Sequence, residues 1–111
     1  MKLSYEDHES ISVLRLSGEL STDHVDAFRR ACQDRFEAGV RDVVLDLEQL
    51  SLIDSQGLEA LLWLQDEAAQ IAGHLRLVKP DQTISKVLQI TRLGRKFTIH
   101  ESVESAAKSL R

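Results

Sequence analysis

The sequence predicts an α/β domain built on a mixed β-sheet of four to five strands with about four helices. Short apolar runs alternate with segments in which apolar residues recur every three or four positions, which indicates strands alternating with helices. The run Val43–Val44–Leu45 is typical of an interior strand covered on both faces. The expected element order is ββαβαβαβα, in which helices between strands imply parallel crossovers.

The first two strands are expected to form an antiparallel hairpin. Apolar residues alternate within Met1–Glu6 and recur in Ile11–Leu16, and the polar stretch 7–10 between them suits a four-residue loop. Gly18 is expected to end the second strand.

The first helix is expected to begin near Ser21. Ser21 or Thr22 can cap it, and Asp23 is favourable in the first turn of a helix. Gly39 is expected to stop the helix. The apolar residues at helical spacing are Val25, Phe28, Ala31, Cys32 and Phe36.

The middle of the chain predicts the central strand and the longest helix. Val40–Leu47 is the expected third strand, and Leu58–Ala72 is the expected helix, closed by Gly73. His74–Val78 is the expected fourth strand.

The C-terminal part predicts two helices flanking a short edge strand. Pro80 and Asp81 open the third helix, and Gly94 ends it. Phe97–Ile99 is the expected edge strand, and the last helix begins near Ser102. The apolar residues that these two helices should bury are Ile84, Val87, Leu88, Val103, Ala106, Ala107 and Leu110.

Composition places the chain among globular single-domain proteins. It has 111 residues, of which 42% are hydrophobic and 29% charged, so a disordered, collagenous or coiled-coil chain is not expected and one domain over residues 1–111 is. A net charge of −4 argues against nucleic acid as a partner. The single cysteine, and the lack of a membrane-span pattern or signal-peptide pattern, favour a cytoplasmic protein without direct membrane insertion.

Motifs of enzymes and cofactor sites are missing. The four histidines lie far apart without metal-ligand spacing, so neither a metal nor another cofactor is expected. Ile53 occupies the position where a serine-hydrolase elbow around Ser55 would need its first glycine. Cys32 falls on the apolar helix face, where a thiol is usually inert. The sequence therefore predicts that the protein is not an enzyme.

A cluster of basic residues follows the fourth strand. Gly94–Arg95–Lys96 lacks the upstream glycine and the following Ser or Thr of a phosphate-binding loop. Arg92, Arg95, Lys96 and Lys86 have no interleaved aromatic residues, so a solvated face is the expected structure.

The segment Leu50–Leu58 is the most informative part of the sequence. An interior strand leads into Asp54–Ser55 at the start of a long helix, where free N–H groups and the helix dipole favour an anion, including a phosphate on Ser55. The simpler alternative is that Asp54 or Ser55 caps the helix and Gly57 permits a tight turn. Residue chemistry alone favours the cap.

Three stretches give the chain a resemblance to a known family. They are Leu16–Ser17–Gly18–Glu19–Leu20, Val43–Val44–Leu45–Asp46–Leu47 and Ile53–Asp54–Ser55–Gln56–Gly57–Leu58. Together with the element order over essentially all 111 residues, they resemble the STAS domain family, specifically the free-standing bacterial anti-sigma factor antagonists.

The resemblance implies a switch controlled by phosphorylation. In that family the serine after the aspartate, here Ser55, is phosphorylated by a partner anti-sigma factor, an ATP-dependent serine kinase of the histidine-kinase-like ATPase fold. The unphosphorylated antagonist binds that kinase and frees the sigma factor, phosphorylation breaks the complex, and a serine phosphatase is the second implied partner. This chain differs from the family at Ser21, where an Asp is usual, and at Glu59, where a small residue is usual.

A helical projection from Leu58 separates an apolar arc from a polar arc. Trp63 falls on the polar side, where it either anchors a partner or packs over the sheet edge or beneath the following helix. The expected core side comprises Leu58, Leu61, Leu62, Leu64, Ala68, Ala69, Ile71 and Ala72, and the polar side comprises Ser55, Gln56, Glu59, Trp63, Asp66, Glu67 and Gln70. The expected partner-binding residues are Asp54, Ser55, Gln56, Gly57, Glu59 and Trp63, with Ser21 and Asp23.

Two other functions are considered from the sequence, a structural subunit and a small enzyme. The chain is alternatively a STAS subunit of a lipid-transport ABC complex, an interaction module that binds an ATPase without being phosphorylated. Glu59 and the missing Asp at position 21 favour this alternative. A small enzyme or nucleotide-binding α/β module would need a phosphate-loop lysine or a histidine-containing polar cluster, and the sequence has neither.

Overall fold

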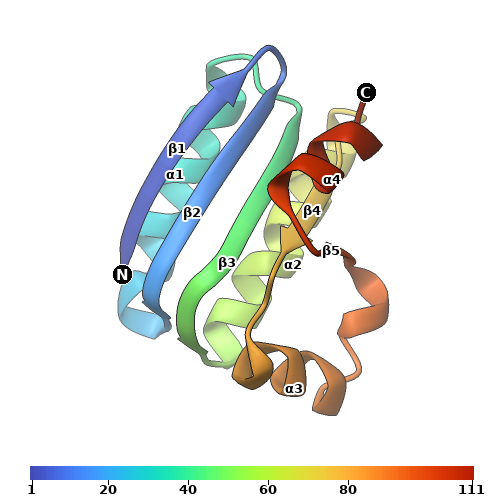
Figure 1. Ribbon diagram of the computed structural model, residues 1–111. Helices are drawn as coiled ribbons and strands as arrows, with labels where there is room; N and C mark the ends of the chain where they lie inside the picture. Colours follow the sequence, from blue (N-terminus) through green and yellow to red (C-terminus); the bar gives the residue numbers. More distant parts are fainter.

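The computed structural model describes all 111 residues and has the predicted order of elements (Figure 1). The strands are β1 (Lys2–His8), β2 (Ile11–Leu20), β3 (Asp42–Ile53), β4 (Leu75–Val78) and β5 (Thr98–His100). The helices are α1 (Val25–Glu37), α2 (Ser55–Gln70), α3 (Gln82–Ile90) and α4 (Val103–Ser109), with short 3₁₀ turns η1 (Thr22–His24) and η2 (Gly94–Lys96). No helix is long and apolar enough to cross a bilayer.

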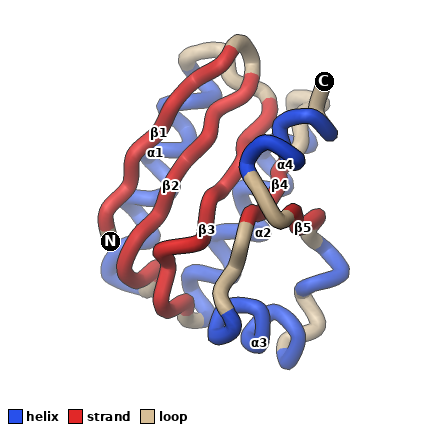
Figure 2. The backbone as a smooth tube through the Cα atoms, in the orientation of Figure 1, coloured by secondary structure: helices blue, strands red, loops and turns tan.

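The five strands form one mixed sheet in the order β1-β2-β3-β4-β5 (Figure 2). β1 pairs with β2 antiparallel, and every other neighbouring pair is parallel. The mixed sheet with parallel crossovers predicted from the alternating pattern is thus confirmed.

Helices cover both faces of the sheet. α1 and α2 pack on one face over the larger core, and α4 packs on the other over a smaller cluster around Val13, Val44 and Val78 (Figure 1). Val43, Val44 and Leu45 in β3 are completely buried, which confirms an interior strand covered on both faces.

Both strands that lead toward the site are longer than predicted. β2 continues past Gly18, which has φ +86° and lies at a shift of register, and ends at Leu20. The tail of β2 pairs with the tail of β3, Ser17 with Gln49 through Leu20 with Ile53, so the two strands extend together. Gly18 therefore lies at a bulge rather than at a strand end.

Several turns also differ from the prediction. The β1–β2 loop contains only Glu9 and Ser10, and Glu9 adopts φ +58°. Ala72 and Arg92, rather than the neighbouring glycines, adopt left-handed conformations after α2 and α3. β5 begins one residue later than predicted, at Thr98, and Phe97 before it is buried in the main core.

Cys32 lies on the core side of α1. Its side chain is completely inaccessible, and burial raises the pKa of the thiol to about 12. The thiolate is therefore essentially unpopulated at neutral pH, in agreement with the inert thiol expected from the sequence.

Candidate functional site

The candidate site is the junction at which β3 enters α2. Ile53 ends the strand and Ser55 begins the helix, so Asp54 alone connects them. The Asp54 N–H donates to the Leu20 carbonyl oxygen at 3.3 Å, which holds the junction against the end of β2.

Asp54 is the N-cap of α2. Its Oδ1 accepts the Gly57 N–H at 2.9 Å, while its Oδ2 accepts the Thr22 N–H at 2.9 Å and the Thr22 hydroxyl at 3.1 Å. The Gly57 and Thr22 amides stabilise the charged form, so the pKa of this carboxyl lies below its ordinary value. Of the two caps considered from the sequence, Asp54 is the correct one.

Asp54 also connects two turns that lie far apart in the sequence. Through its bonds to Thr22, the start of α2 is held against η1, which contains Asp23 and follows Ser21. The sequence predicts Thr22 only as a helix cap, because a local pattern cannot indicate a partner 32 residues away. Ser21 does not cap α1: its hydroxyl lies 3.1 Å from His24 Nδ1, and the α-helix begins only at Val25.

Gly57 lies within the first turn of α2 rather than in a loop, which corrects the tight-turn interpretation. It is buried, and a Cβ there would lie 2.3 Å from the Leu20 carbonyl oxygen and 2.7 Å from Ile53 Cγ1. The absence of a side chain allows α2 to approach the end of β2 this closely. The position of Ser55 therefore depends on Gly57.

Ser55 is exposed, and the side-chain hydrogen bonds at this junction are all made by Asp54 and not by the Ser55 hydroxyl. Gln56 is exposed beside it, and Glu59 is exposed one turn later without an ion-pair partner. Asp23 is exposed and Ser21 half-buried on the adjoining η1 segment. The structure thus gathers the predicted residues, Trp63 excepted, around the start of α2.

Trp63 lies two turns further along α2 and is half-buried. It packs against the margin of the main core, and the Arg29 guanidinium of α1 lies 5.6 Å from its ring centroid. The structure therefore places it between α1 and α2, unlike either packing arrangement considered from the sequence. Part of the ring remains accessible beside the exposed face of α2.

The predicted core side of α2 is wrong at its C-terminal end. Ala69, Ile71 and Ala72 are exposed, and Ile71 retains 42% of its accessible surface. The helix ends at Gln70, so residues 71 and 72 do not follow the helical projection.

Comparison with known proteins decides the family. A family model described as the STAS domain matches residues 2–106, almost the whole chain. The chain belongs to the STAS domain family. The fold expected from the resemblance is confirmed, with its five-stranded mixed sheet and four helices.

The most informative STAS relatives are anti-sigma factor antagonists. The anti-sigma F factor antagonist of Lysinibacillus sphaericus is 35% identical over 83 residues, covering 74% of this chain and 71% of that protein. SpoIIAA, an anti-sigma factor antagonist, is 27% identical in its unphosphorylated form, with a TM-score of 0.76 over 97% of this chain and 96% of its own. The phosphorylated form of Bacillus SpoIIAA is 28% identical, with a TM-score of 0.77 over 99% and 100%.

The names of these relatives describe their action on anti-sigma factors. Anti-sigma factor antagonists are regulators rather than enzymes, in agreement with the prediction from the missing motifs. The phosphorylated form of SpoIIAA shows that a related protein of the same fold accepts phosphate.

Proposed function

We propose that this STAS protein is a partner-switching regulator whose unphosphorylated form binds an anti-sigma factor, and that phosphorylation of Ser55 ends this binding. The observation that carries the proposal is the free, exposed Ser55 hydroxyl at the start of α2. Because Asp54 supplies the cap, Ser55 is not needed to satisfy the helix end and can be modified without loss of that cap. The phosphorylated form of SpoIIAA supports the proposal.

The proposed partner is a serine kinase of the histidine-kinase-like ATPase fold. In the transfer, Ser55 Oγ forms a bond to the γ-phosphorus of ATP, the bond from that phosphorus to the β,γ-bridging oxygen breaks, and ADP leaves. The hydroxyl proton passes to a base that the kinase supplies. A serine phosphatase hydrolyses the phosphoserine and restores the binding form.

Phosphorylation concentrates negative charge at one end of α2. The phosphate adds about −1.5 to −2 charge at neutral pH, beside the Asp54 carboxylate and one helical turn from Glu59. The positive end of the helix dipole opposes this repulsion with roughly 0.3–1 kcal/mol. The net result is a strongly anionic surface where the unmodified protein presents a neutral hydroxyl.

The proposal is tested by mapping the modification. The chain is incubated with ATP and the ATP-dependent kinase that copurifies with it, and its peptides are analysed by mass spectrometry. We expect one phosphate on the peptide that contains Ser55 and none in Ser55→Ala. A phosphate on another residue, or none with a kinase that binds the chain and is active, would contradict the proposal.

Glu59 is expected to slow the modification. It lies four residues after Ser55 on the exposed side of α2 and has no cationic partner, so it repels the incoming phosphate. Glu59→Gln should therefore raise the phosphorylation rate by about two- to fivefold, the larger value at low salt. The rate is measured by phosphate incorporation, with Asp66→Asn as a control that removes an exposed carboxylate further along the helix. An unchanged rate in Glu59→Gln would show that Glu59 does not oppose the phosphate, and a lower rate would show that Glu59 assists recognition.

Trp63 is expected to contribute to both folding and binding. Half-burial and the Arg29 contact lead us to expect that Trp63→Ala lowers the free energy of unfolding by about 1–2 kcal/mol. Because part of the ring is accessible to a partner, we expect Trp63→Ala also to weaken the free energy of partner binding by about 1–2 kcal/mol. Chemical denaturation and titration against the partner measure the two effects, and Trp63→Phe, which retains an aromatic ring, should lose less of each. Unchanged affinity in Trp63→Ala would remove Trp63 from the interface.

One observation favours the alternative function as a STAS subunit of a lipid-transport ABC complex. Glu59 places an unpaired carboxylate where phosphorylation would be disfavoured. In that function the chain binds an ATPase partner through the same face and carries no phosphate. Copurification with a transport ATPase, together with an unmodified Ser55, would support this alternative over the switch.

A further inference from the structure

A second candidate site lies away from Ser55, where α3, η2 and β5 meet. An open pocket of about 740 Å³ is lined there by Arg92, Arg95, Leu88, Ile99, Ser85 and Gln89. The lining includes two guanidinium groups and no carboxylate. Gln65 of α2 donates to the Lys96 carbonyl oxygen at 2.7 Å, which holds η2 in place. None of these residues belongs to the Ser55 site.

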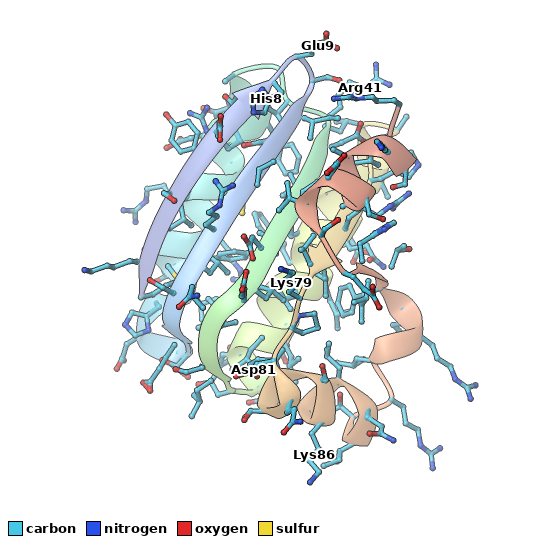
Figure 3. All side chains as sticks on the ribbon, viewed as in Figure 1. His8, Glu9, Arg41, Lys79, Asp81 and Lys86 are labelled. Carbon is cyan, nitrogen blue, oxygen red and sulfur yellow. The ribbon has the colours of Figure 1, made fainter.

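Positive charge is concentrated in this part of the chain. Residues 82–99 contain Lys86, Arg92, Arg95 and Lys96 and no acidic residue, which gives this stretch a net charge of +4. Since the whole chain has a net charge of −4, the rest carries −8. None of the four cations forms an ion pair, although seven ion pairs occur elsewhere. Lys86 extends from α3 into solvent (Figure 3).

Arg92 occupies a backbone position that usually favours glycine. It follows the C-cap Thr91 with φ +62°, and its N–H donates to the Gln89 carbonyl oxygen while the Leu93 N–H donates to the Leu88 carbonyl oxygen. These two bonds form a Schellman motif, in which glycine is the common residue at the left-handed position. Arginine at this position is conformationally less favourable than glycine. It adds a positive charge to the lining of the pocket.

The pocket also has an apolar component. Leu88 is almost completely buried and Ile99 is 45% exposed, so an apolar group entering the pocket would cover Ile99. Ile90 on α3 is exposed to 73%, the highest value among the large apolar side chains of the chain. A flat anionic surface such as a lipid bilayer would pair with the cations but would leave the pocket empty. A peptide can present carboxylates and an apolar side chain together, so it can also fill the pocket.

We propose that this pocket binds an acidic segment of a protein partner, in which one apolar side chain is flanked by carboxylates. The carboxylates pair with Arg92 and Arg95, and the apolar side chain contacts Leu88 and Ile99. In the unbound chain these basic residues are exposed, as expected from the sequence, and they become a contact surface only when the segment binds. The interaction gives the protein a second contact surface that phosphorylation of Ser55 does not alter directly.

The test uses a fluorescent peptide with one Leu flanked on each side by Glu residues. Its affinity for the full chain is measured by anisotropy, and backbone amide NMR locates the site. We expect peptide-induced changes in amide chemical shift to be confined to residues 82–99. We also expect the peptide to bind at least tenfold more weakly to Arg92→Gly and to Arg95→Gln. Arg30→Gln, which removes an exposed and unpaired arginine from α1, should bind as the unmodified chain does. Peptides with Gln in place of Glu, or Ser in place of Leu, should bind at least tenfold more weakly.

Arg92→Gly separates binding from folding, because glycine suits the left-handed position and should leave the free energy of unfolding unchanged or higher. The proposal would be overturned if Arg30→Gln and Arg92→Gly lost equal affinity for the acidic peptide. It would also be overturned if the peptide with Gln in place of Glu bound as tightly as the acidic one. Arginine-dependent binding of anionic vesicles or single-stranded oligonucleotides in preference to the peptide would also overturn it. Phosphorylation of Ser55 should be unchanged in Arg92→Gly, so the result is independent of the proposed switch.

Discussion

Gly57→Ala is expected to lower the free energy of unfolding by about 2–3 kcal/mol. The added Cβ would lie 2.3 Å from the Leu20 carbonyl oxygen, and this backbone atom cannot rotate away as a side chain could. Overpacking of this kind typically costs about 1–3 kcal/mol and occasionally more. The better helix propensity of alanine, up to about 1 kcal/mol, offsets only part of the cost. The start of α2 must shift, which would also weaken the bond from Gly57 to Asp54 and lower partner affinity.

Urea unfolding of Gly57→Ala and Gly94→Ala provides the measurement with its matched control. A Cβ at Gly94 would meet its nearest atoms, all from Leu88, at 3.8–4.0 Å, which is ordinary contact. We therefore expect Gly94→Ala to unfold within about 0.5 kcal/mol of the unmodified chain. Equal stability of the two variants would mean that α2 can move away from β2 at little cost, and that Gly57 does not set the position of Ser55.

Ser55→Asp is expected to weaken partner binding by about ten- to hundredfold. The substitution places a carboxylate on a surface that already carries Asp54 and Glu59. Binding would remove this charge from water without giving it a cationic partner, which costs free energy. Ser55→Ala removes only the hydroxyl and should bind within about twofold of the unmodified protein, because the side-chain hydrogen bonds at the junction are made by Asp54 and stay intact.

Calorimetric titration of the purified anti-sigma factor with both variants measures this effect. Gln70→Glu adds the same charge at the other end of the exposed face of α2 and serves as the control. It should change affinity less than Ser55→Asp does. If Ser55→Asp binds as tightly as the unmodified chain, charge at the start of α2 does not control the complex and the proposed switch is wrong.

The sequence was sufficient to predict the fold but not the lengths of its central strands. Three consecutive β-formers identified β3 as interior, because a strand covered on both faces must be apolar at successive positions. The extension of β3 to Ile53 depends on pairing with the tail of β2. That pairing joins residues more than 30 positions apart, and a local apolar pattern contains no information about it.

The candidate site was predictable to a similar degree. Asp54 was correctly considered as a cap, because capping depends on residues within one turn of the helix. Its second partner, Thr22, comes from another turn and could not be inferred locally. Trp63 fell on the polar side of a helical projection, but its ring lies against Arg29 of a neighbouring helix that the projection does not include.

The completely buried Cys32 gives the molecule an intrinsic reporter of its own opening. Because burial excludes reagent and suppresses the thiolate, an alkylating agent can modify Cys32 only in molecules whose core has transiently opened. When reclosing is faster than alkylation, the modification rate measures the population of the open form. A partner that binds only the closed form would slow alkylation in proportion to its occupancy. The native thiol can therefore follow complex formation without an added label.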